Sequence, residues 1–264
     1  MTGVCTSRRK ELRAYVALAF LFSWGVWLPV VFLFHDVRTL PAWALGLTFV
    51  GIYAPSIAAL ASAWQQGGQS ELCALLRTSF IGHVCWGWYA VILFGPPAFV
   101  WTGAVVEMVL GGQIHTRGLA SFASAAAILL SFVPFGPLGE ELGWRGYMLP
   151  RLSLSPLSSS LVLGIIWAAW HAPAFWIAPV GLPVRTIDSL AVWTSNILSF
   201  SVLLSYVARR TQYNVPIATL FHASLNAGSA SGLAVLAAPQ SVLQRVGELA
   251  LCLRWLATFA AAAP

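Results

Sequence analysis

The chain has 264 residues, of which 59% are hydrophobic and only 8% are charged. A soluble domain is typically about 25% charged and 45–50% apolar, so this chain has too little polar surface to cover a water-soluble globule. The mean hydropathy of +0.80 agrees. A soluble enzyme, a nucleic-acid-binding protein and a disordered chain are therefore excluded. The composition predicts an all-α polytopic transmembrane bundle of about eight helices, forming one domain over residues 1–264.

Net charge and cysteine content add little to this prediction. The formal net charge is +6, but the basic residues are scattered between apolar runs and form no patch with interleaved aromatics, so nucleic acid is not expected as a partner. The four cysteines are far apart and form no CxxC pair, which indicates neither a zinc site nor a disulfide framework. They are Cys5, Cys73, Cys85 and Cys252.

Apolar runs define the membrane spans, because a bilayer core about 30 Å thick needs about 20 apolar residues in a helix. The first run is longer than the roughly 7–15 apolar residues of a signal peptide, which predicts an uncleaved first helix. The last run is the most polar, because it contains Glu248 and Arg254. The predicted spans are 14–34, 42–64, 84–110, 120–138, 157–178, 187–208, 215–238 and 244–262.

Loop charge predicts the orientation. With a cytoplasmic N-terminus, nine basic residues lie on the inside and four on the outside, which agrees with the positive-inside rule. Arginine in preference to lysine and the alanine-rich composition favour a bacterial inner membrane. Several tryptophans near span ends are typical of interface anchors; they are Trp43, Trp64, Trp86, Trp88, Trp176 and Trp193.

Two glutamates and an arginine follow the fourth predicted span. An ionisable residue in a membrane segment costs roughly 2.5–3.5 kcal/mol on insertion scales and marks a functional site by default. Glu141 and Arg145 are four residues apart and can pair on a helix. Glu140 points about 100° away from Glu141, and its apolar surroundings favour the role of a general base. Alternatively, these residues only cap a helix at the membrane surface.

Two further polar sites lie inside predicted spans. His171 has apolar neighbours on every side and precedes Pro173; a histidine of this kind is a catalytic candidate or a hydrogen-bonded core residue. His222 and Asn226 are four residues apart in the seventh span, so both project from one helix face. They are catalytic candidates or an interhelical polar clamp.

Taken together, the three sites predict a cytoplasm-facing polar cavity. The fourth span ends at the cytoplasmic face, and the fifth and seventh spans begin there. A carboxylate, two imidazoles and an amide around such a cavity supply what amide hydrolysis needs: a base for water, donors for the oxyanion and candidate metal ligands.

The motifs resemble those of a known family. Glu140-Glu141-xxx-Arg145, Trp167-xxx-His171 and His222-xxx-Asn226, with the string GEELGWRGYMLPRL, are similar to the EExxxR, FxxxH and HxxxN motifs of the CPBP intramembrane proteases, also called the Abi or type II CAAX prenyl endopeptidase family. The resemblance covers roughly residues 130–230. Trp167 departs from the pattern, since it replaces phenylalanine.

The resemblance implies a role for each motif residue. Glu140 is the base that activates water, aided by His171, and His222 with Asn226 holds the oxyanion. Glu141 and Arg145 are structural or orient the site and the substrate carboxylate, with Trp167 as the motif aromatic. The implied substrate is a membrane-associated or prenylated CAAX-type protein or peptide, cut near its C-terminus on the cytosolic side. Metal dependence stays open: a divalent ion such as zinc is not required by the sequence.

Two other classes of function compete with the protease. A transporter or channel could use the same buried residues to relay protons or bind an ion, but the two halves of the chain show no internal repeat. A non-catalytic protein for bacteriocin immunity or for the maturation of membrane proteins is the second alternative. Functional residue types at all six motif positions favour the enzyme.

Overall fold

The computed structural model describes residues 2–34, 39–80, 82, 84–109, 129–173 and 187–235. The regular structure within these ranges is entirely helical and comprises nine α-helices and one π-helical segment. Helices satisfy all their backbone hydrogen bonds internally, as a chain surrounded by lipid requires. The all-α prediction is therefore confirmed for this part of the chain.

The first half contains four helices. Helix α1 spans Thr2–Leu33, α2 spans Ala42–Ile52, α3 spans Ala54–Phe80 and α4 spans Gly87–Val109. The predicted span 42–64 is not one straight helix, because α2 and α3 meet at an angle of 50°. Pro55 causes this bend, because it has no N–H to donate to the carbonyl of Gly51. The Gly51 carbonyl accepts a hydrogen bond from the Ser23 hydroxyl at 2.8 Å instead.

The second half contains the helices that carry the motifs. Three short segments follow one another without a break: α6 (Pro137–Glu141), the π-helical η3 (Leu142–Met148) and α7 (Leu149–Arg151). We call this stretch, Pro137–Arg151, the motif helix. The remaining helices are α8 (Pro156–Trp170), α9 (Ile187–Arg210) and α10 (Val215–Val235).

Two of the predicted spans in this half start at the same residues as the observed helices, and one observed helix ends before its predicted limit. Helices α9 and α10 begin at residues 187 and 215, as predicted. Helix α8 ends at Trp170 and not at 178, because Pro173 cannot continue a helix. The predicted span 244–262 and residues 120–128 of the predicted span 120–138 lie outside the described residues.

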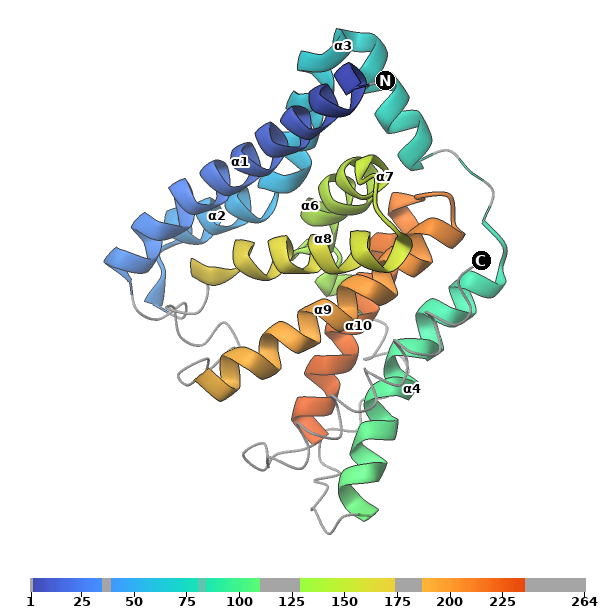
Figure 1. The fold of residues 1–264 in the computed structure, drawn as a ribbon. Helices are drawn as coiled ribbons and strands as arrows, with labels where there is room; N and C mark the ends of the chain where they lie inside the picture. The colour runs from blue at the N-terminus through green and yellow to red at the C-terminus, as the bar shows by residue number, and fades with distance from the viewer. Residues whose placement is uncertain are drawn as a thin grey trace.

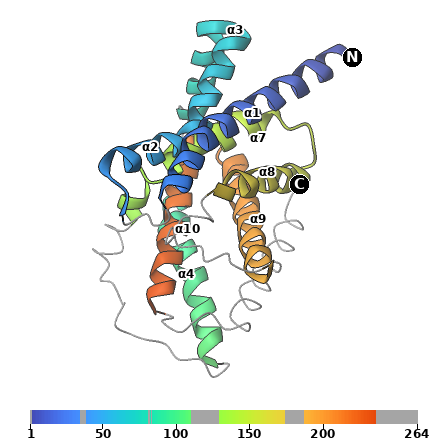
Figure 2. The same ribbon diagram turned by 90° about the vertical axis from the view of Figure 1, so that its left-hand side faces the viewer.

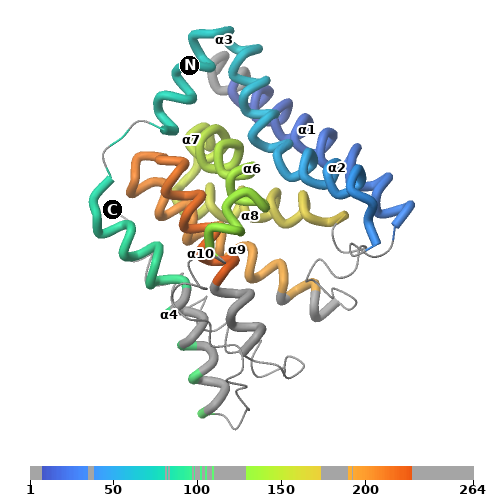
Figure 3. Tube along the Cα trace, turned by 180° about the vertical axis from the view of Figure 1, so that it is seen from behind, coloured from blue at the N-terminus to red at the C-terminus, as the bar shows by residue number. Residues whose placement is uncertain are grey.

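The helices form layers around the motif helix (Figures 1 and 3). Helices α1, α2 and α3 lie together on one side, and α4 and α10 run side by side on the other. Helices α8 and α9 pack against each other, while the motif helix lies in the middle and contacts both α3 and α10. Figure 2 shows α3 and α4 reaching toward opposite ends of the molecule. Residues from distant parts of the sequence therefore meet at the motif helix.

The outer surface of the described helices is strongly apolar. Trp86 is 83% exposed, and Phe32 and Val109 are each 77% exposed; apolar exposure on this scale is unfavourable in water and suits a lipid environment. Among the described residues, one helix, Arg8–Leu33, is long and apolar enough by itself to cross a bilayer, and the bent pair α2–α3 is a second when counted as one span. The number of eight spans and the orientation of the cavity remain predictions.

Candidate active site

The motif helix is pressed tightly against the first half of the molecule. A Cβ atom on Gly143 would lie 2.5 Å from the carbonyl oxygen of Pro55, and one on Gly139 would lie 2.9 Å from the carbonyl oxygen of Ile52. Only glycine fits at either position, since real Cβ atoms do not approach other heavy atoms so closely. Every residue from Gly139 to Leu149 is consequently buried, including the charged ones.

A π-helical segment begins directly after the two glutamates. It covers Leu142–Met148 and includes Arg145. Segments of this kind are rare, and they occur frequently at functional sites because they change the direction in which side chains leave the helix. The EExxxR motif thus lies where an α-helix changes into a wider one.

Glu141 is the centre of a buried ionic cluster. Its Oε1 accepts a hydrogen bond from Arg145 Nη1 at 2.8 Å, which confirms the pair predicted from the four-residue spacing. The same oxygen lies 2.8 Å from Nδ1 of His222, and both Glu141 and Arg145 are fully buried. Glu141 therefore links the first and third motifs, and it orients the His222 ring.

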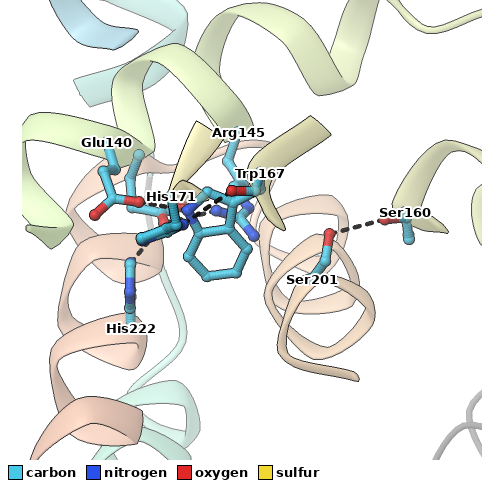
Figure 4. A network of polar contacts seen from close by, with 8 residues as sticks. Glu140, Arg145, Ser160, Trp167, His171, Ser201 and His222 are labelled. Atoms are coloured by element: carbon cyan, nitrogen blue, oxygen red, sulfur yellow. Dashed lines mark hydrogen bonds and ion pairs between the residues drawn. The ribbon is translucent and has the colours of Figure 1, made fainter. Parts of the chain in front are cut away.

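Glu140 has a different environment, as the 100° offset predicted. Its Oε2 accepts a hydrogen bond from the indole Nε1 of Trp167 at 2.5 Å, and its side chain is almost fully buried, with 4% of the residue exposed. Figure 4 shows Glu140, Trp167, His171 and His222 grouped at one place, although they come from three helices, α6, α8 and α10. Both carboxylates are thus held in place, but by different partners.

His171 lies at the C-terminal end of α8. Its Nδ1 is 2.9 Å from the carbonyl oxygen of Trp167. A carbonyl oxygen only accepts, so Nδ1 carries the hydrogen and Nε2 of the neutral ring keeps a free lone pair. His171 is half-buried, and its ring lies 5.7 Å from the Trp167 ring. Its ring lies in the same group of side chains as Glu140 (Figure 4).

Asn226 lies one helical turn after His222 on α10 and is half-buried. Two contacts fix this helix. Asn214 Oδ1 accepts the N–H of Ile217 at 3.1 Å at the start of the helix, and the Ser224 hydroxyl donates to the carbonyl of Ile92 on α4 at 2.6 Å. The predicted shared face of His222 and Asn226 is therefore present, with His222 bound to Glu141.

Residues of α1 that were predicted only to span the membrane support the site. Trp24 Nε1 donates to the carbonyl of Trp170 at 3.0 Å, and Trp170 Nε1 donates to the Ser23 hydroxyl at 2.6 Å. These bonds fix the end of α8 next to His171. The only sequence signal for them is a serine within an apolar run. A serine hydroxyl in a helix can equally bond the carbonyl four residues earlier, so the serine alone does not predict a contact between helices.

Trp193 was predicted to be an interface anchor, and this was wrong. Only 8% of it is exposed, and its ring lies 5.6 Å from the ring of His171. The hydropathy pattern places Trp193 near a span end, but it does not show which face of α9 turns toward α8. Trp43 and Trp86, at 57% and 83% exposed, remain consistent with anchors.

The described residues include no group of three or more His, Cys, Asp or Glu side chains arranged to hold a metal ion. The donors closest to such a set are Glu140, His171 and His222, which come from three helices. Their arrangement brings together a carboxylate with one oxygen bound to the Trp167 indole, an imidazole bound to a backbone carbonyl, and a second imidazole paired with a buried carboxylate.

Comparison with known proteins agrees with the resemblance of the motifs. Residues 122–228 match the family model described as type II CAAX prenyl endopeptidase Rce1-like. The family resemblance predicted from the motifs is confirmed. All seven predicted site residues lie within the matched range. The resemblance to CAAX prenyl endopeptidases supports an enzyme of the protease class.

A curated relative shows the same resemblance at low identity. It is CAAX prenyl protease 2 of Methanococcus maripaludis, which is 24% identical over 146 residues. The alignment covers 52% of this chain and 53% of the relative, so the chain spans about half the length of the curated relative that it matches.

Proposed function

We propose that this protein is an intramembrane endopeptidase that hydrolyses a peptide bond near the C-terminus of a membrane-associated or prenylated, CAAX-type substrate. The observation that carries the proposal is the meeting of Glu140, His171 and His222 around Trp167, with each side chain held by a separate contact. Structural capping would not require three helices to bring these groups together.

The proposed reaction uses one free oxygen of Glu140. Trp167 occupies Oε2, so Oε1 takes the proton from water as the hydroxide attacks the substrate carbonyl. His171 Nε2 assists this proton transfer. The proton then passes to the leaving amine, which completes hydrolysis.

His222 and Asn226 are proposed to stabilise the oxyanion. The Nδ1 of His222 faces Glu141, so its Nε2 can donate to the oxyanion only when the ring is doubly protonated. The four charges on Glu140, Glu141, Arg145 and His222 then sum to zero, which makes their burial tolerable. The Asn226 amide is the second donor.

The site is proposed to face the cytoplasm of a bacterial inner membrane, with the N-terminus on the same side. Nine basic residues against four support this orientation. His171 and Asn226 are more exposed than Glu140 and Glu141, so water and substrate are proposed to approach from their side. The polar cavity predicted there is part of the proposal.

Cleavage of defined peptides by the purified protein tests the proposed function. We expect detergent-purified or liposome-reconstituted protein to release a C-terminal fragment from a farnesylated CAAX peptide. The unprenylated peptide is the matched control for the lipid, and the same reactions with a chelator report metal dependence. Failure to cleave prenylated, unprenylated and membrane-anchored peptides would rule out the peptidase.

The oxyanion assignment is tested by the Asn226→Ala variant. Loss of one oxyanion donor typically lowers kcat by about 10²–10³-fold, and we expect this loss with little change in KM. Ser224→Ala, on the same helix, removes a hydroxyl bound to α4 and serves as the control for helix displacement. An Asn226→Ala enzyme with raised KM and unchanged kcat would show that Asn226 binds substrate uniformly and does not stabilise the oxyanion.

A further inference from the structure

We infer that Trp167 is a positioning residue for the general base: its indole N–H fixes one oxygen of Glu140 and leaves the other facing the reacting water. This inference rests on the proposed function, because it assigns Trp167 a role through Glu140. It goes beyond the motif resemblance, which places phenylalanine, a residue without a donor, at this position.

The contact between the two residues is direct and buried. Trp167 Nε1 and Glu140 Oε2 are 2.5 Å apart and belong to helices α8 and α6, 27 residues apart in the sequence. Trp167 is 1% exposed and Glu140 is 4% exposed. A hydrogen bond to an ionised carboxylate is shorter and stronger than one between neutral groups, and the burial of both side chains restricts access of solvent to it.

The rest of the indole contacts the other motif residues. The Arg145 guanidinium lies over the Trp167 ring, 4.5 Å from its centroid, and the His222 ring meets it edge-on at 5.2 Å. The backbone carbonyl of Trp167 accepts from His171. Phenylalanine could keep the backbone contact and an aromatic face, but it supplies neither the N–H nor the full size of the indole (Figure 4).

The direction of the expected effect follows from the donor. An N–H that donates to a carboxylate favours the charged form over the neutral one, so loss of this donor is expected to move the acidic limb of the activity profile to higher pH. The other charged or titratable groups around Glu140 and its cluster stay the same when only the indole is changed. They are Glu141 and Arg145 on the motif helix, Tyr15 on α1, His171 at the end of α8 and His222 on α10.

The pH dependence of kcat/KM for Trp167→Phe tests the inference on the cleaved peptide. We expect the acidic limb to move to higher pH by about one unit, with kcat falling about tenfold near the wild-type limb and KM changing less than about twofold. Activity should recover as pH rises, because hydroxide from solution restores the ionised base. Benzothienylalanine at position 167 keeps nearly the shape of the tryptophan side chain but has sulfur in place of the N–H. This variant should show the same shift of the acidic limb.

Trp144→Phe is the matched control. Trp144 is also fully buried and lies on the motif helix, but its Nε1 has no hydrogen-bond partner among the described residues. The acidic limb of the Trp144→Phe enzyme should therefore stay at the wild-type pH. If Trp167→Phe and the benzothienylalanine variant move the limb no further than Trp144→Phe does, the inference is overturned. Failure of the proposed function would give a different result. In that case Glu140→Gln would retain cleavage, or the wild-type protein would cleave no peptide. Either outcome would overturn the proposed function and the inference about Trp167 together.

Discussion

Glu140→Gln is expected to lower the cleavage rate by about 10²–10⁴-fold, the usual contribution of a positioned general base. Glutamine has the shape of glutamate and can still accept the Trp167 N–H through its amide oxygen, so the hydrogen bond at Oε2 is retained. What is lost is the ability to take a proton from water. The measurement is single-turnover cleavage of the peptide by purified protein, with the thermal unfolding midpoint as the check on folding.

A glutamate elsewhere in the fold provides a control for charge alone. Glu71 is an acidic residue on α3 that lies outside the candidate site, and Glu71→Gln removes one negative charge without contacting the cluster. We expect it to cleave at the wild-type rate. A Glu140→Gln protein that is folded and as active as Glu71→Gln would contradict the assignment of Glu140 as the base.

Arg145→Met is expected to destabilise the protein by about 3–5 kcal/mol, the usual cost of removing one partner from a buried ion pair. Both Glu141 and Arg145 are fully buried, at 2.8 Å from each other. Without Arg145, His222 is the remaining partner of the Glu141 carboxylate among the described residues. Chemical unfolding of the purified protein in detergent, followed by tryptophan fluorescence, measures the change.

A double variant separates the ion pair from the reaction. Replacing both partners with apolar residues is often neutral or stabilising, so Glu141→Leu with Arg145→Met should regain most of the lost stability. Its activity should stay low, because His222 no longer has a carboxylate at Nδ1. Arg151→Met is the control on the same helix. Arg151 is half-buried, donates to the Tyr147 carbonyl at 3.1 Å and lies over the Tyr147 ring at 4.0 Å, which predicts a loss of about 1 kcal/mol. Equal stability of Arg145→Met and Arg151→Met would contradict the prediction.

Local spacing and apolar run length were sufficient to predict most helices and one site contact. Helix α1 ends at Leu33, close to the predicted limit of 34, because its run is apolar up to that point. The Glu141–Arg145 pair follows from two residues on consecutive turns of one helix. Such predictions depend only on neighbours in the sequence, and they need no knowledge of how helices pack.

Contacts between helices could not be predicted in the same way. The spacing of His222 and Asn226 shows that they share a face of α10, but not that His222 reaches Glu141, 81 residues earlier. The Trp167–Glu140 bond depends on the rotation of α8 about its axis, and the π-helical segment changes the direction of the side chains after Glu141. The Trp167–Glu140 bond and the π-helical segment both depend on how the helices pack. The glycines of the motif helix permit this packing, but the spacing of residues in the sequence does not reveal it.

The hydrogen bonds from α1 to the end of α8 limit how far the protein can be shortened. The region that carries the motifs, roughly 130–230, does not include Ser23 or Trp24, and yet these residues occupy the indole N–H and the carbonyl of Trp170. A fragment reduced to that region would expose both polar groups beside His171, together with the glycine face that rests on Pro55. The smallest catalytic unit must therefore include the first helix, even though that helix carries none of the chemistry.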